Sequence, residues 1–176
     1  MKATGIVRRI DDLGRIVIPK EIRRSLNIRE GDPLELFTMD GGVCFKKYSF
    51  ISENQIFFDK LYKGLTDNDN FIVAITDTDR IISGKERYLG TNLSKALSDE
   101  ICKEKYKYTD ENQVVENIPL TDDEYNKFFV KKIYRISPTI GAIILFNRGT
   151  DGISVPIELD MEIKYIKKTI KRELEE

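Results

Sequence analysis

The stretch that decides how the chain begins to fold is KATGIVRRIDDLGRIVIPKEIRR, residues 2–24. It contains two β-branched runs, 5–10 and 15–18, separated by DDLG at 11–14, and aspartate and glycine are favoured in tight turns. Pro19 follows the second run, and proline is tolerated at the first position of a helix, where its missing N–H would have no partner. The stretch therefore predicts two short strands joined by a turn, followed by a short helix.

Outward from this stretch, the sequence predicts a second hairpin. The helix is expected to end near Asn27, and GDP at 31–33 leads into strands at 34–37 and 43–46 around the turn MDGG at 39–42. A segment of about 50 residues with such short strands buries little apolar surface, and domains of this size are marginal without disulfides, metals or oligomerisation. We therefore expect hairpins of two chains to interleave in a dimer.

The charge of the chain is divided unevenly. Residues 1–50 carry ten basic and seven acidic side chains, a net charge of +3, whereas the remainder carries a net charge of −4. Up to Arg29 there are eight basic residues against three acidic ones. This asymmetry is expected when only one end of a protein approaches phosphate groups.

The absence of histidine limits the possible chemistry. It excludes nucleophiles activated by imidazole and metal sites built from imidazole. The acidic residues show no compact spacing typical of a catalytic pair or a magnesium site, and Asp77 and Asp79 are interpreted as turn residues. We therefore expect no enzyme, no catalytic residues, no metal and no cofactor.

The sequence also indicates a cytoplasmic protein. It has no run of about 18 apolar residues and no apolar segment before a small-residue cleavage site, so neither a membrane span nor a secretory signal is expected. Cys44 and Cys102 lie far apart in ordinary mixed stretches, which is typical of buried free thiols in a reducing compartment. We expect no membrane partner.

The remainder of the chain alternates between helical and strand patterns. Apolar residues spaced three or four apart predict a connecting helix over 52–64 and another over 89–106. Short β-branched or aromatic runs predict strands at 71–76, 81–84, 114–118, 127–136 and 139–147. Aromatic residues here, including Phe128 and Tyr134, are candidates for a ligand pocket, although core packing is the more frequent role of such side chains.

The last element is an amphipathic helix that begins after Pro156. Its apolar seam is narrow and consists of Leu159, Ile163, Ile166, Ile170 and Leu174. The seam either packs into the core of its own chain or meets a partner helix, with the stripe at 57–65 as the natural candidate. We favour association between chains, which predicts a tetramer through the terminal helices.

The residues 2–24 resemble the AbrB-type family of swapped-hairpin DNA-binding regulators. The resemblance continues through Leu26, GD at 31–32, LEL at 34–36 and KKY at 46–48. It implies an α+β chain with two domains: residues 1–50 form a swapped-hairpin β-barrel in an interlocked dimer, and residues 51–176 form a GAF-like α/β sensor domain flanked by helices.

The resemblance also implies which side chains bind double-stranded DNA. Four arginines face the DNA, and three further basic residues are candidate phosphate contacts: Arg8, Arg15, Arg23 and Arg24, then Lys2, Arg9 and Lys20. Arginine can bind phosphate or guanine through two parallel hydrogen bonds, whereas lysine acts as a point charge. Family members with a GAF-type second half regulate sporulation genes of endospore-forming bacteria, so we expect the same role, with an unidentified small molecule as a candidate ligand of the second half.

The alternative function is an antitoxin-like protein-interaction module that also binds DNA at its own promoter, since the swapped-hairpin fold also occurs in toxin-neutralising proteins. Those proteins usually carry a disordered tail, whereas the residues after Tyr48 are patterned as folded elements. The transcription regulator is therefore the preferred interpretation. The target promoters, and whether the regulator activates or represses, do not follow from the sequence.

Overall fold

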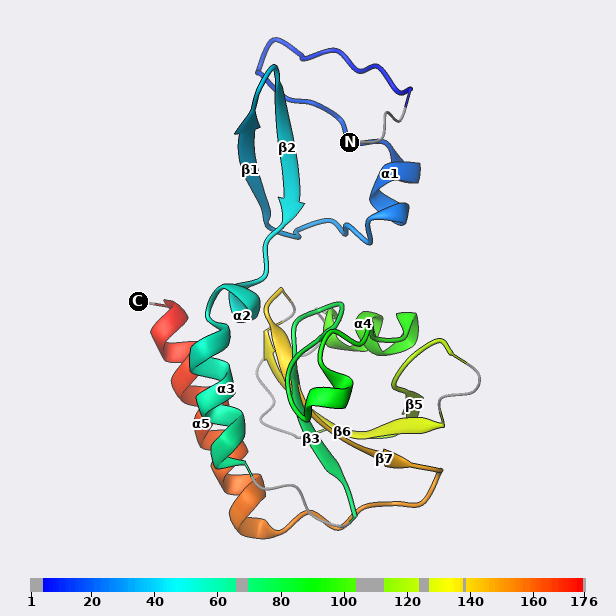
Figure 1. Cartoon of the computed structure of the whole chain (residues 1–176), viewed down its shortest axis with the longest axis vertical. Helices are drawn as coiled ribbons and strands as arrows, with labels where there is room; N and C mark the ends of the chain where they lie inside the picture. Colours follow the sequence, from blue (N-terminus) through cyan, green and yellow to red (C-terminus); the bar gives the residue numbers. More distant parts are fainter. Residues whose placement is uncertain (1–4, 66–69, 104–112, 124–126, 138, 176) are drawn as a thin grey trace. The chain divides into compact units, whose positions relative to one another are not determined.

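A computed structural model describes residues 5–65, 70–103, 113–123, 127–137 and 139–175. The chain divides into two compact units, Met1–Lys47 and Tyr48–Glu176 (Figure 1). Each unit is described by itself below.

The N-terminal unit contains one helix and one hairpin. Helix α1 spans Lys20–Ser25, and strands β1 (Leu34–Met39) and β2 (Gly42–Lys47) pair antiparallel. The register pairs Met39 with Gly42, so that Asp40 and Gly41 form the turn, with Gly41 at φ 71°. Positive φ at the second residue of a two-residue turn favours glycine, which adopts it without strain. The predicted helix and the second predicted hairpin are thus confirmed.

The loop after α1 is fixed by backbone and side-chain contacts. Ile28 N donates to Arg23 O (2.7 Å) and Asn27 N donates to Arg24 O (3.2 Å), while Asn27 has φ 52°. This is the double hydrogen-bond pattern of a Schellman helix end. Lys47 Nζ then joins the loop to the end of β2, because it contacts Asn27 O (3.2 Å) and the buried carboxylate of Asp32 (3.0 Å).

The strands predicted at 5–10 and 15–18 are not found in the single chain. Both runs are irregular, and neither joins the β1–β2 hairpin. The turn between them does form, with Gly14 N donating to Asp11 O (2.9 Å). A strand is defined by a ladder of hydrogen bonds with a neighbouring strand, and among the described residues of this unit the ladder present is that of β1 with β2. Their apolar side chains remain in solvent: Val7 is 85% exposed and Val17 is 73% exposed.

The C-terminal unit is built around one antiparallel sheet of five strands in the order β4-β3-β7-β6-β5. Two helices precede the sheet, one short helix and a 3-10 turn lie within it in sequence, and a long helix follows it. The elements are α2 (Phe50–Glu53), α3 (Gln55–Gly64), β3 (Ile72–Thr76), β4 (Ile81–Ser83), η1 (Glu86–Tyr88), α4 (Lys95–Ile101), β5 (Gln113–Pro119), β6 (Phe128–Ser137), β7 (Gly141–Arg148) and α5 (Ile157–Glu175).

The sheet separates two apolar cores, because side chains alternate between its faces. On β7, Ile143 and Leu145 face the core that is covered by α3 and α5, whereas Ile144 and Phe146 face the core that is covered by α4. Figure 1 shows the helices on the two sides of the sheet. A sheet that is apolar on both faces needs cover on both, and the three helices provide it.

The helix predicted over 89–106 is shorter in the structure. It begins only at Lys95, because Ser94 caps it by accepting a hydrogen bond from Leu97 N (3.1 Å). The residues before Ser94 are held by η1 and by a bridge between Arg80 and Asn92. Positions 104–106 lie outside the described residues. Cys44 also differs from expectation: it is exposed on β2 rather than buried.

Helix α5 uses its apolar seam within its own chain. Leu159, Ile163 and Ile170 are buried in the same core as Phe58 of α3. A second apolar row on α5 is exposed and is spaced four residues apart: Ile157, Met161 and Tyr165. The seam therefore serves core packing, and the side chains left for a partner are different ones.

A polar cluster fixes α5 to strand β6. The Asp160 carboxylate accepts hydrogen bonds from Lys132 Nζ (2.6 Å) and Tyr134 Oη (2.6 Å), and pairs with Lys164 at 2.9 Å. Burial alone would raise the pKa of Asp160, but the hydrogen bonds from Lys132, Tyr134 and Lys164 outweigh it and hold that pKa well below its ordinary value. Burial and the bond to Asp160 raise the pKa of the Tyr134 hydroxyl. Asp160 is therefore ionised throughout the physiological range.

This cluster predicts a pH-dependent stability. Asp160→Asn should lower the free energy of unfolding at pH 7 by about 1–3 kcal/mol, because the half-buried Lys132 ammonium and the buried Tyr134 hydroxyl lose their charged acceptor. The folded-state pKa is depressed, so the contribution is complete above the unfolded-state pKa of about 4 and is lost as the pH falls through the folded-state value. Denaturant unfolding of wild type and variant between pH 3 and 8 should show a difference that shrinks below pH 4. Glu162→Gln, at an exposed position of the same helix, is the control and should change little.

Candidate nucleic-acid interface

The predicted DNA-contacting residues lie on two segments of the N-terminal unit. Arg8, Arg9 and Arg15 flank the turn at 11–14, and Lys20, Arg23 and Arg24 belong to α1. Five of the seven are exposed, namely Arg8, Arg9, Arg15, Lys20 and Arg24; Arg23 is half-buried and Lys2 lies outside the described residues. Within the part of the chain that the structure describes, no hydrogen bond or ion pair joins the turn arginines to those of α1. The single chain thus presents two basic segments.

The turn segment is ordered by Asp11. Its carboxylate accepts hydrogen bonds from the backbone N–H of Leu13 (3.0 Å) and of Arg15 (2.8 Å), and it pairs with Arg15 Nε at 2.8 Å. The backbone and side-chain hydrogen bonds from Arg15 lower the pKa of Asp11. Arg8 is also held locally, since its Nη1 donates to Val7 O (3.2 Å). Arg8 and Arg15 are therefore exposed but not fully free to rotate.

The α1 segment places its two arginines in different surroundings. Both lie in the last turn, where positive charge is favoured by the helix dipole. Arg24 is exposed, whereas Arg23 is half-buried and its Nε is enclosed without a hydrogen-bond partner in the structure. Arg24 is thus available to a phosphate over its whole guanidinium group, and Arg23 mainly through the end of its side chain. This difference could not be predicted from the sequence, because it depends on how the two side chains pack.

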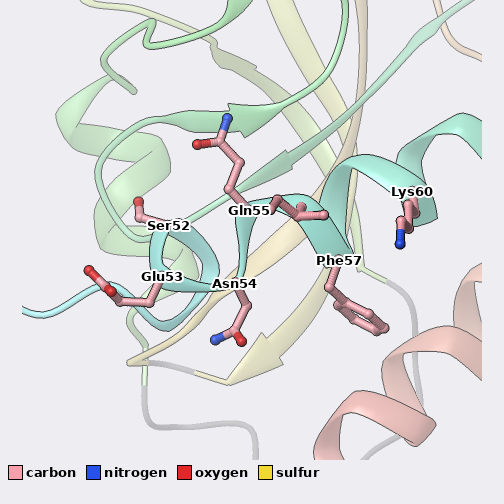
Figure 2. Close-up of a pocket in the computed structure, with 7 residues that line it drawn as sticks. Ser52, Glu53, Asn54, Gln55, Phe57 and Lys60 are labelled. Carbon is pink, nitrogen blue, oxygen red and sulfur yellow. The ribbon is translucent and has the colours of Figure 1, made fainter.

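A surface depression of the C-terminal unit lies at the junction of α2 and α3, and Figure 2 shows the side chains that line it. The lining residues are Ser52, Glu53, Asn54, Gln55, Ile56, Phe57 and Lys60. All come from one short stretch of chain, and the labelled side chains point in different directions rather than converging. Ligand sites are usually enclosed and have a few convergent polar groups. The depression lacks that architecture.

The aromatic residues that could line a pocket are packed instead. Phe128 lies edge-on to Tyr88 and to Phe146, with ring centroids 5.4 Å and 5.9 Å apart, and these three rings belong to the core on the α4 side of the sheet. Tyr134 is buried in the opposite core. Core packing, the more frequent role of such residues, is the one that the structure shows.

The acidic turn after β3 is a structural turn. Asp77 Oδ1 accepts hydrogen bonds from Asp79 N and Arg80 N, both at 2.8 Å, and Asp77 Oδ2 accepts one from Ser49 Oγ (2.9 Å). Among the described residues there is no group of three or more acidic or cysteine side chains that could hold a metal ion. None of the helices formed by the described residues is long and apolar enough to span a membrane.

Several residues important to these surfaces were missed by the sequence analysis. Asp11 orders the arginine turn, and Lys47 pairs with Asp32 to fix the loop after α1. An aspartate four residues before an arginine, across a turn that contains glycine, is a local signal that could have identified the first pair. The second pair joins residues 15 apart in the sequence, which no short pattern links.

Comparison with known proteins relates the N-terminal unit to DNA-associated regulators and to antitoxins. The family described as "Antidote-toxin recognition MazE, bacterial antitoxin" matches residues 7–49. The transition state regulatory protein AbrB of Bacillus subtilis is 56% identical over 48 residues, which are 27% of this chain and 50% of that protein. A solution structure of the N-terminal DNA recognition domain of the Bacillus subtilis transition-state regulator AbrB is 55% identical and covers 28% of this chain and 92% of its own, with a TM-score of 0.25.

A further relative covers both units. Stage V sporulation protein T of Bacillus subtilis is 43% identical over 153 residues, which are 84% of this chain and 86% of that protein. The similarity therefore extends far beyond the N-terminal unit and accounts for most of the length of both proteins. The chain belongs to the family of stage V sporulation protein T.

Proposed function

We propose that this chain is a transcription regulator that binds double-stranded DNA through its N-terminal unit and acts on sporulation genes. The observation that carries the proposal is the 43% identity to stage V sporulation protein T over most of both chains. Exposed arginines on the turn and on α1, in a segment with a net positive charge, supply the chemistry that phosphate requires. The matched relatives are named as regulatory or sporulation proteins, and the proposal includes no enzymatic activity and no cofactor.

The predicted contacts favour modest sequence specificity. Phosphate contacts fix the position of a protein on DNA, whereas base edges and DNA shape carry the sequence information. The basic residues lie on a turn and on a helix of six residues, so no long recognition helix is available to enter the major groove. Selectivity therefore rests on a few arginine contacts and on the deformability of the bound DNA.

An interlocked dimer of N-terminal units is part of the proposal. No residue of α1 is buried, and β1 and β2 are exposed along nearly their whole length. Apolar side chains from all parts of the unit remain in solvent, including Val7, Val17 and Phe45. The runs at 5–10 and 15–18 also have β-branched residues, and neither run forms a strand in the single chain. A second copy would supply both the missing strands and the missing core, as in a swapped-hairpin β-barrel.

For the C-terminal unit we propose a GAF-like domain that links dimers. Its antiparallel sheet with helices on both faces suits an α/β sensor domain, and the functional division is placed at residues 1–50 and 51–176. The exposed row Ile157, Met161 and Tyr165 on α5 supports contact with a second copy and hence a tetramer. A small-molecule ligand and a cytoplasmic location stay predictions.

The alternative is an antitoxin-like interaction module, which the match to the MazE family at residues 7–49 favours. The residues after Lys47 argue against it, since they form a folded unit with two buried cores. A segment that must wrap a toxin would instead need to be available for folding on binding.

The DNA-binding face can be tested by removing its charge. The combined variant Arg15→Ala, Arg23→Ala and Arg24→Ala should bind labelled sporulation-promoter DNA at least tenfold more weakly in fluorescence anisotropy, with a shallower dependence of log Kd on log salt, because each lost phosphate contact lowers the slope by about 0.9. The variant Lys60→Ala, Lys95→Ala and Lys168→Ala removes the same charge from exposed positions of the C-terminal unit and should bind nearly as well as wild type. Equal loss in both variants would contradict the assigned face.

The proposed tetramer predicts a mass that depends on α5. Light scattering of the full chain should give four subunits, and Met161→Glu with Tyr165→Glu should give two, because two charges would be buried in the contact. Glu162→Lys, at an exposed position on the same helix, should leave four. A wild-type dimer, or an unchanged mass in the double variant, would exclude this contact.

The antitoxin alternative predicts a different response to protease. Limited trypsin digestion of the full chain should release a stable fragment that begins near Tyr48, because the buried sheet protects its backbone. Mass spectrometry identifies the fragment. Complete digestion of the residues after Tyr48, under conditions that leave residues 5–47 intact, would favour the alternative.

A further inference from the structure

One carboxylate lies among the arginines of the turn and contacts one of them directly. Asp11 Oδ1 accepts hydrogen bonds from Leu13 N and Arg15 N, and Asp11 Oδ2 is 2.8 Å from Arg15 Nε. The backbone closes the same turn, since Gly14 N donates to Asp11 O (2.9 Å) and Asp11 N donates to Arg15 O (3.1 Å). Asp11 thus holds both the backbone and the side chain of Arg15.

This pairing determines which edge of the guanidinium group is offered to a ligand. The Nε side faces the carboxylate, so the two terminal nitrogens, Nη1 and Nη2, form the edge that points away from it. The Arg15 side chain remains 70% exposed, which leaves that edge open to solvent. An edge with two parallel N–H groups suits bidentate binding of a phosphate or of guanine.

The negative charge of the Asp11 carboxylate also repels the phosphates of any DNA sequence. A phosphate that drew Arg15 away from the turn would have to break the pair with Asp11 and would meet its negative charge. A phosphate or base that binds Arg15 in its existing orientation leaves the pair with Asp11 intact. The Arg15 side chain then loses less conformational entropy on binding. Asp11 therefore weakens DNA contacts that require Arg15 to reorient more than DNA contacts that bind Arg15 in its existing orientation.

We propose that Asp11 is a positioning residue that raises the selectivity of the DNA-binding turn by fixing the orientation of Arg15. The inference rests on the proposed function. It adds a residue that increases the difference in affinity between preferred DNA sequences and other sequences. This role explains why an acidic side chain, Asp11, lies on a surface that binds negatively charged DNA.

The turn supplies a matched control. Asp12 is the next residue, is also exposed, and carries the same charge, but the structure shows no hydrogen bond or ion pair from its side chain to any described residue. Asp11→Asn keeps an oxygen that can accept the hydrogen bonds from Leu13 N and Arg15 N, and loses only the charge that holds Nε. Asp12→Asn makes the same change of charge without touching Arg15.

The experiment measures selectivity in the full chain. Two labelled DNA probes are used: a fragment selected by the wild-type protein from a random pool, and a shuffled fragment of the same length and composition. In Asp11→Asn the ratio of the two affinities should fall about two- to fivefold, the range expected for an exposed ion pair. For the shuffled probe, the salt slope should steepen by about 0.9, as the released Arg15 neutralises one more phosphate. In Asp12→Asn both affinities should change together and the ratio should stay constant.

A double-mutant cycle shows whether the effect passes through Arg15. In an Arg15→Ala background, Asp11→Asn should leave the ratio unchanged, since there is no guanidinium group to position. Circular dichroism and the unfolding midpoint of each variant establish that the turn variants are folded. A ratio and slope equal to wild type in folded Asp11→Asn, or an equal loss of ratio in the Arg15→Ala background, would overturn the inference while leaving the proposed function intact. Failure of wild type to bind the selected fragment better than the shuffled one would overturn both.

Discussion

The N-terminal unit carries more apolar surface than one copy of its chain can bury. Its single helix has no buried residue, and the side chains of Val7, Val17 and Phe45 lie in solvent. Burial of apolar surface is the main favourable contribution to folding, and this exposure is the observation behind the proposed dimer. The proposed dimer would have a two-fold axis, and it would double the basic segments that can contact DNA with matching symmetry.

The C-terminal unit solves the same packing problem within one chain. Alternating side chains of its sheet fill two cores, and α3 and α5 cover one face while α4 covers the other. Asp160 adds a polar attachment between α5 and β6 to this apolar packing. The two halves of the chain thus differ in their packing: the C-terminal unit covers its sheet with its own helices, whereas the N-terminal unit leaves apolar side chains exposed.

Local patterns were sufficient for elements that depend on their own residues. The turn at Asp40 and Gly41, the helix after Pro19 and the terminal helix after Pro156 were predicted within a few residues, because proline, glycine and apolar spacing act over short distances. The run at 5–10 was predicted as a strand but has no partner in the single chain, since pairing depends on another segment. The helix at 89–106 was predicted too long because its apolar period begins before Ser94, whose hydroxyl sets the true start.

The candidate site shows the same division. The candidate arginines were named from the sequence; Arg8, Arg15 and Arg24 are exposed, and their contact with DNA stays a prediction. The half-buried state of Arg23 and the hold of Asp11 on Arg15 could not, because both depend on side-chain geometry. The cluster around Asp160 joins residues 26 and 28 positions apart, which no local pattern connects.

The connection between the two units is very short. Strand β2 ends at Lys47 and helix α2 begins at Phe50, so two residues, Tyr48 and Ser49, join them. A connection of that length spans at most about 10 Å when fully extended. Once two N-terminal units associate, their C-terminal units are tethered at a local concentration in about the millimolar range. Contacts too weak to form between separate molecules then become significant, so that even a shallow apolar row on α5 can influence how many copies assemble on one piece of DNA.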